Sequence, residues 1–219
     1  MKKITVFSLS FFLVFGTPLA YATTLIDKSF KEIVMKAGEI FEAEVIGQYS
    51  EATDEAIYTY VTFRILHQMK GGTSETTRTL RFKGGEVGGI ILTVHGMPTF
   101  EVGQRVILFV KENITDQTIS PIVGWIQGKF TVETDSTGTE VMRDGLGMKI
   151  TGFDSEKGEL VRERLPRSER PVPVVVGGSS DRLISPLPQS GTERPKPGLS
   201  KDAFKAIIGD LVRQLEVVP

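Results

Sequence analysis

Few side chains in this sequence have the types and spacing of a catalytic or metal-binding site. The two histidines, His67 and His95, stand alone, and the absence of cysteine removes thiol catalysis and thiolate metal ligands. No serine lies in a G-x-S-x-G pattern. Glu42 and Glu44 could act as a general acid and base, but we expect them on an exposed strand face that discourages aggregation. No metal or cofactor is therefore expected.

The glycine-rich stretch FKGGEVGGI, residues 82–90, is a candidate phosphate loop. Its glycines do not follow the spacing G-x-G-x-x-G, and no Lys-Ser or Lys-Thr pair follows them. The next residues, IILTV, favour a strand and not the helix start that would direct N–H groups at an anion. Glycine also supplies the positive φ that tight turns require. We therefore expect a chain reversal between strands.

Aromatic side chains give a candidate binding surface. Tyr58, Tyr60 and Trp125, together with Phe130, could form an aromatic face for sugars or for an extended peptide. The alternative is that these residues pack the core and the surface of a sheet.

Strands are the elements expected to position these residues. Residues 57–70 alternate most clearly, with one face expected in the core (Ile57, Thr59, Val61, Phe63 and Ile65) and the other carrying Tyr58, Tyr60, Thr62 and Arg64. Residues 105–110 are apolar on both faces, which is typical of a central strand. Further strands are expected near residues 40–47, 76–82, 90–94, 119–133 and 139–142. A capping box formed by Ser29 and Glu32 predicts a short helix over 30–37.

The C-terminal part of the chain has a different composition. Residues 154–198 are rich in proline, glycine and alternating charges, which predicts an extended linker. Residues 199–219 form a predicted amphipathic helix with one apolar stripe, made of Phe204, Ile207, Ile208, Leu211 and Leu215. Either this stripe packs on the sheet of its own chain, or the helix is kept for a protein partner.

The N-terminus has the pattern of a secretory signal peptide. Lys2 and Lys3 precede an apolar run over 4–16, and Ala20-Tyr21-Ala22 forms a cleavage site. We expect export, cleavage after Ala22, and a periplasmic or secreted protein with no integral membrane segment, because the run is shorter than the about 20 residues of a span. Cleavage would leave 24 basic and 27 acidic side chains, a balance that does not favour nucleic acid. The predicted domains are 1–22, 23–153, 154–198 and 199–219.

Three phrases in order, AGEIFEAEVIG, VTFRILHQMKGG and VGQRVILFV, resemble exported bacterial proteins of unassigned role. Their spacing is similar to that of netrin-like and metalloproteinase-inhibitor modules, over roughly 37–132. This resemblance implies a mainly β fold with a small, five-stranded, Greek-key barrel of the oligonucleotide/oligosaccharide-binding (OB) type after a short helix. Those inhibitors reach the protease zinc through an N-terminal cysteine, which this chain lacks. No inhibitory residue is therefore carried over.

Together these patterns favour an exported, non-enzymatic binding protein that engages a protein partner. Two alternatives stay open at this point: a regulator or inhibitor of an extracytoplasmic protease, and a hydrolase with an unrecognised site. The identity of the partner does not follow from the residues.

Overall fold

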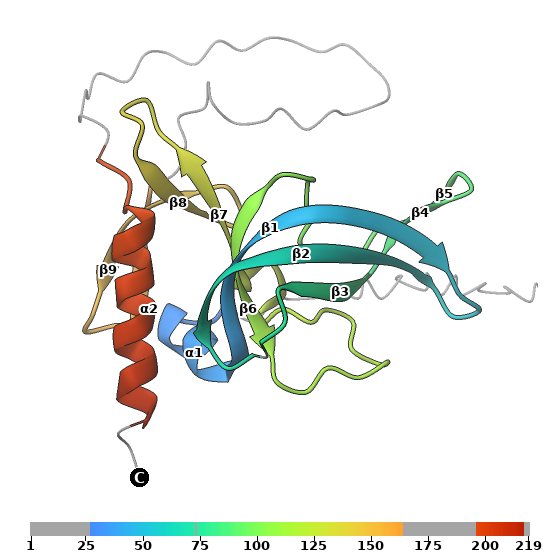
Figure 1. Cartoon of the computed structure of the whole chain (residues 1–219), viewed down its shortest axis with the longest axis horizontal. Helices are drawn as coiled ribbons and strands as arrows, with labels where there is room; N and C mark the ends of the chain where they lie inside the picture. Colours follow the sequence, from blue (N-terminus) through green and yellow to red (C-terminus); the bar gives the residue numbers. More distant parts are fainter. Residues whose placement is uncertain (1–26, 73, 164–195, 217–219) are drawn as a thin grey trace, which may run out of the picture.

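The computed structural model describes residues 27–72, 74–163 and 196–216. The predicted signal peptide, and residues 164–195 of the predicted linker, lie outside the described residues. The described chain is mainly β (Figure 1). Its elements are α1 (Phe30–Lys36), β1 (Ala37–Ala52), β2 (Ile57–Lys70), β3 (Thr77–Lys83), β4 (Gly85–Val87), β5 (Ile90–Leu92), β6 (Arg105–Lys111), the 3-10 helix η1 (Trp125–Gly128), β7 (Lys129–Thr134), β8 (Glu140–Asp144), β9 (Lys149–Asp154), β10 (Glu159–Glu163) and α2 (Lys201–Glu216).

Eight of the strands form one antiparallel sheet in the order β10-β9-β8-β7-β6-β1-β2-β3. The end strands β10 and β3 do not pair with each other in the described chain, so the sheet is not closed into the predicted OB-like barrel. The physical reason is that the central strands are apolar on both faces. A closed barrel has one interior, whereas here the two faces of the sheet bury separate cores.

Strand β6 shows this arrangement most directly. Ile107 and Phe109 face a core shared with α1 and α2, whereas Val106, Leu108 and Val110 face a second core with β2 and β3. All five side chains are fully buried, which confirms the prediction of a central strand over 105–110. The second core is covered by the segment that contains Phe100, which contacts the Phe63 ring with centroids 5.2 Å apart.

Helix α1 forms where its capping box predicts. The Glu32 N–H donates to the Ser29 hydroxyl, and the Ser29 N–H donates to the Glu32 carboxylate, which satisfies two N–H groups at the helix start. Phe30 then packs edge-on against Phe109 and Phe130, with ring centroids 5.5 and 5.7 Å away. This contact fixes α1 against the sheet.

Helix α2 lies along the same face of the sheet, beside α1 (Figure 1). Phe204 and Ile208 are fully buried and Leu211 is 7% exposed, while Ile207 and Leu215 pack against the same core. The stripe is therefore covered by the chain's own sheet, which is the self-docked alternative. In this arrangement the five residues offer no open apolar face to a partner, and a role of the helix in partner binding stays a prediction.

The sheet also continues beyond the predicted boundary at residue 153. Strand β9 ends at this boundary, and β10, which pairs with it as a hairpin, lies inside the range predicted as linker. Its turn is set by Asp154, whose carboxylate accepts the N–H groups of Glu156 and Lys157. Leu160 then enters the helix-side core at 5% exposure. The alternating charges of residues 159–163 therefore lie on an edge strand, whose composition is similar to that of a linker.

Candidate functional site

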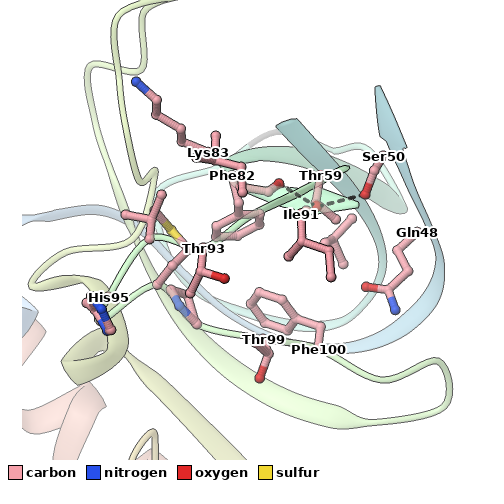
Figure 2. Close-up of a pocket in the computed structure, with 18 of the residues that line it drawn as sticks. Gln48, Ser50, Thr59, Phe82, Lys83, Ile91, Thr93, His95, Thr99 and Phe100 are labelled. Atoms are coloured by element: carbon pink, nitrogen blue, oxygen red, sulfur yellow. Dashed lines mark hydrogen bonds between the residues drawn. The ribbon is translucent and has the colours of Figure 1, made fainter. Parts of the chain in front are cut away.

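A groove of about 670 Å³ opens at the end of the sheet farthest from the helices, between β1, β2, β3 and residues 93–100 (Figures 1 and 2). Its floor is apolar, because it is lined by Val61, Phe82 and Phe100. Each of these side chains is at most 6% exposed. Ile91 of β5 also lines the groove but is 68% exposed. The groove thus joins a buried aromatic floor to an exposed apolar lip.

The glycine-rich stretch positions this lip. Strands β4 and β5 pair around a turn of two glycines, Gly88 and Gly89, whose φ values are 59° and 80°. Such a turn needs two residues with positive φ. Gly85 has a φ of 137°, and a Cβ there would lie 2.4 Å from Thr59 Oγ1. Glycine therefore lets the hairpin approach β2, and the predicted chain reversal is confirmed.

The polar groups beside the glycine hairpin are neutral hydroxyls. Thr59 Oγ1 donates to the Gly84 carbonyl over 2.8 Å, and Ser50 Oγ lies 3.0 Å from Thr59 Oγ1. Because the single hydroxyl proton of Thr59 is used for Gly84, Ser50 donates to Thr59. Among the described residues, the printed hydrogen bonds join Ser50 to Thr59 and Thr59 to the backbone of Gly84, so the pair holds the hairpin in place.

A buried lysine supports the opposite wall. Lys129 is 7% exposed, and its ammonium donates to the Thr99 carbonyl and lies 4.7 Å from the centroid of the Phe100 ring. Burial lowers the pKa of Lys129 to about 8, and the nearby Glu101 carboxylate opposes this shift. Lys129 thus fixes the segment that carries Phe100. Sequence analysis missed it, although a lysine between Gly128 and Phe130 in an apolar stretch was a usable signal.

The predicted aromatic face is assembled only in part. Tyr58 and Tyr60 share the face of β2 opposite the groove floor, where Tyr58 is 6% exposed beneath Arg81 and Tyr60 stacks on Tyr49 at 5.0 Å. Trp125 belongs to η1, which lies against β6 and β7, and its φ of 59° is a left-handed value. Phe130, the fourth aromatic residue of the prediction, is fully buried in the helix-side core. These residues therefore do not form one binding surface.

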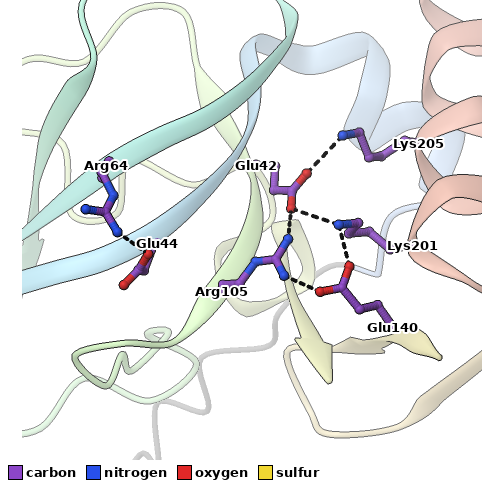
Figure 3. A network of polar contacts seen from close by, with 7 residues as sticks. All are labelled: Glu42, Glu44, Arg64, Arg105, Glu140, Lys201 and Lys205. Atoms are coloured by element: carbon purple, nitrogen blue, oxygen red, sulfur yellow. Dashed lines mark hydrogen bonds and ion pairs between the residues drawn. The ribbon is translucent and has the colours of Figure 1, made fainter. Parts of the chain in front are cut away.

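Glu42 lies in a buried ionic network on the other side of the sheet (Figure 3). It is 3% exposed and accepts from Arg105 at 2.5 Å and from Lys205 at 2.9 Å. Lys201 joins it at 3.5 Å and bridges to Glu140 at 2.5 Å. The expectation of a solvated Glu42 is therefore wrong, because α2 covers this face of β1.

The network determines the ionisation of Glu42. Burial alone would raise the pKa of this carboxyl, but hydrogen bonds from Lys205 and Arg105 outweigh it and hold the pKa below its usual value. An ionised Glu42 paired with cations on α2 is a structural contact between helix and sheet. It does not have the raised pKa of a general acid.

The histidines do not contribute a metal site. His67 is exposed on β2, and His95 is exposed at the groove. Within residues 27–72, 74–163 and 196–216, no three histidine, aspartate or glutamate side chains gather in a way that could hold a metal ion.

No helix in the same ranges combines the length and apolar character that a membrane crossing requires.

A scan against models of protein families, a search of curated proteins and a search of solved structures found no match to this chain. The resemblance to netrin-like and inhibitor modules therefore stays a prediction. Function has to be argued from the groove itself.

Proposed function

We propose that this chain is an exported binding protein whose groove receives an uncharged, apolar segment of a partner protein. The observation that carries the proposal is the groove's build: a buried aromatic floor made by Phe82 and Phe100, next to an exposed Ile91. Apolar surface that is both concave and open to solvent is typical of sites for apolar groups. The volume of about 670 Å³ falls within the usual range of ligand sites.

The chemistry of the rim favours a ligand without charge. Ser50, Thr59, Thr93 and Thr99 offer hydroxyls, and Lys83 is the only lysine, arginine or carboxylate among the described lining residues. A charged group buried here would lose hydration without gaining an opposite charge on the floor. An apolar side chain loses only its contact with water, which stabilises the complex.

The neighbouring hairpin favours a protein over a small molecule. Ile90 and Ile91 follow each other on β5, so their side chains lie on opposite faces, and each is 68% exposed. A small molecule in the groove would contact Ile91 and leave Ile90 in water. A partner protein can cover both. An extracytoplasmic protease is one class of such partner, which would make this chain a protease regulator, while no observation on the described residues favours a hydrolase.

Selection from a library of displayed peptides tests the proposal. We expect the mature chain to enrich peptides that carry apolar side chains, and Thr93→Trp, which places a large side chain at the exposed groove rim, to abolish the enrichment. Thr79→Trp, on the opposite face of the sheet, is the matched control and should select the same peptides as the unmodified chain. Selection that is insensitive to Thr93→Trp would remove the groove as the binding site.

A further inference from the structure

We propose that the partner segment binds as an additional β-strand along the free edge of β5. This inference rests on the proposed function and specifies its ligand: an extended, uncharged peptide with alternating apolar side chains. Three observations support it, namely the free backbone groups of β5, the direction of the Ile91 side chain, and the lack of any device that protects this edge.

The pairing of β4 and β5 leaves one residue with free backbone groups. Val87 lies opposite Ile90 across the two-glycine turn, and Glu86 lies opposite Ile91. In a hairpin with a two-residue turn the first pair exchanges both hydrogen bonds, and the next pair exchanges none. The N–H and C=O of Ile91 therefore point away from β4. Neither has a hydrogen-bond partner among the described residues.

The same residue links this edge to the groove. Figure 2 shows the Ile91 side chain directed into the space enclosed by Phe82, Phe100 and Gln48. In antiparallel pairing, the residue directly opposite Ile91 has its side chain on the same face. A peptide that pairs with Ile91 thus places one side chain over the groove and its two neighbours on the other face, beside Ile90.

Within the part of the chain that the structure describes, the outer edges of β3 and β10 are covered or charged, whereas the outer edge of β5 is neither. Beside β3, the Lys83 N–H donates to the Ile119 carbonyl and Arg81 donates to the Asp116 carbonyl. The outer strand β10 carries Glu159, Arg162 and Glu163 in its five residues. Charges of this kind discourage strand addition. β5 consists of Ile-Ile-Leu, which has no charge, no proline and no bulge.

A second copy of this chain fits the edge less well than a longer peptide. Two β5 strands of three residues each would pair over a short length. Stable protein interfaces bury about 1,200–2,000 Å². An extended peptide can continue past β5 along Thr93, which also has no hydrogen-bond partner among the described residues. It can also contact the groove floor.

The test measures binding of a capped peptide of alternating valine and serine by fluorescence anisotropy. With valine over the groove in antiparallel pairing, the valine N–H groups point toward β5. N-methylation of the valines should therefore weaken binding about tenfold or more, because hydrogen bonds are lost, and N-methylation of the serines should not. Ile91→Pro, which removes the free N–H, should weaken binding more than Ile91→Ala, which keeps it. Equal melting temperatures of the two variants and the unmodified chain serve as the control for folding.

The outcomes separate this inference from the proposed function. If Thr93→Trp abolishes binding while neither set of N-methyl groups does, the groove stands and strand addition is wrong. If serine methylation alone weakens binding, strand addition stands with parallel pairing. If the peptide does not bind, or binds Thr93→Trp as tightly as the unmodified chain, the proposed function fails as well. A dimer in solution that Ile91→Pro converts to a monomer would show that the edge is occupied by a second copy.

Discussion

At the scale of single residues, two glutamates that look alike in the sequence have different environments. Glu42 and Glu44 lie two positions apart on the same face of β1. Glu42 is covered by α2 and receives three cations, whereas the side chain of Glu44 is 29% exposed and pairs with one arginine, Arg64. Local alternation predicts their shared face correctly. It does not predict what covers that face, because the covering helix lies far along the chain.

The first prediction compares these two carboxylates. Glu42→Gln leaves the cations of the buried network with only Glu140 as a counter-ion, and should lower the free energy of unfolding by about 3 to 5 kcal/mol. Glu44→Gln is the matched control on the same strand and should cost less than about 1 kcal/mol. Chemical denaturation of both variants checks this. Equal losses would mean that Glu42 is not held as described.

The second prediction concerns Lys129 and pH. Its pKa in the folded chain is about 8, below the ordinary value of 10.5, so the unfolded chain binds more protons between these two pH values. Stability from this group must therefore rise as the pH increases from about 8 to 10.5, by about 2 to 3 kcal/mol. Lys129→Met should flatten the rise. Parallel stability profiles of the two proteins over this range would contradict the assignment.

At the scale of elements, the sequence predicts those whose pattern is local. The capping box of α1, the alternation of β2 and the apolar run of β6 are confirmed, because each depends on neighbouring residues. η1 was expected as part of a strand over 119–133, but Gly124 and Trp125 both take positive φ and turn the chain. β10 was missed because charged residues alternate along this edge strand, and β9 was missed because Gly152 interrupts its short run of strand-forming residues.

The third prediction tests the register of β2. Phe63 is fully buried between the rings of Phe41 and Phe100, so Phe63→Ala should cost about 3 to 5 kcal/mol through lost burial and a cavity. Tyr60 is half-buried on the opposite face and stacks on exposed Tyr49, so Tyr60→Ala should cost less. Urea denaturation gives both values. A larger loss for Tyr60→Ala would place the wrong face of β2 in the core.

The fourth prediction tests the docking of α2. Removal of residues 199–219 exposes the core around Phe30 and removes Phe204, Ile208 and Leu211, each of which contributes about 1.5 to 3 kcal/mol by burial. Because domains are stable by only about 5 to 15 kcal/mol, the shortened chain should melt at a much lower temperature or fail to fold. Thermal melting monitored by circular dichroism checks this. An unchanged midpoint would show that α2 does not dock on its own sheet.

At the scale of the whole molecule, the sequence predicts a mainly β chain but not its shape or its groove. The groove brings together β1, β2, β3, the β4–β5 hairpin and residues 93–100, and its lining residues extend from Gln48 to Phe100 in the chain. Its floor residues, Phe82 and Phe100, look like ordinary core residues in the sequence. They become part of a candidate site because the glycine hairpin and the 93–100 segment enclose a groove over them.

A ligand in the groove and a ligand on α2 would contact different methyl groups. A peptide in the groove contacts Val61, Ile91, Leu92 and Met97, at the end of the sheet away from the helices. The alternative surface, α2, has different reporters. Leu215 and Ile207 lie on its stripe, packed against the helix-side core. The two surfaces thus have distinct methyl groups, and one spectrum separates them.

The most direct measurement is methyl-selective NMR of residues 23–219, titrated with a peptide that this chain selects. We expect shift changes at the methyl groups of Val61, Ile91 and Leu92, with those of Ile207 and Leu215 unchanged. The same titration of Thr93→Trp should give no shift changes. Shift changes confined to Ile207 and Leu215, with the groove methyl groups unmoved, would contradict the groove as the binding site and assign binding to α2.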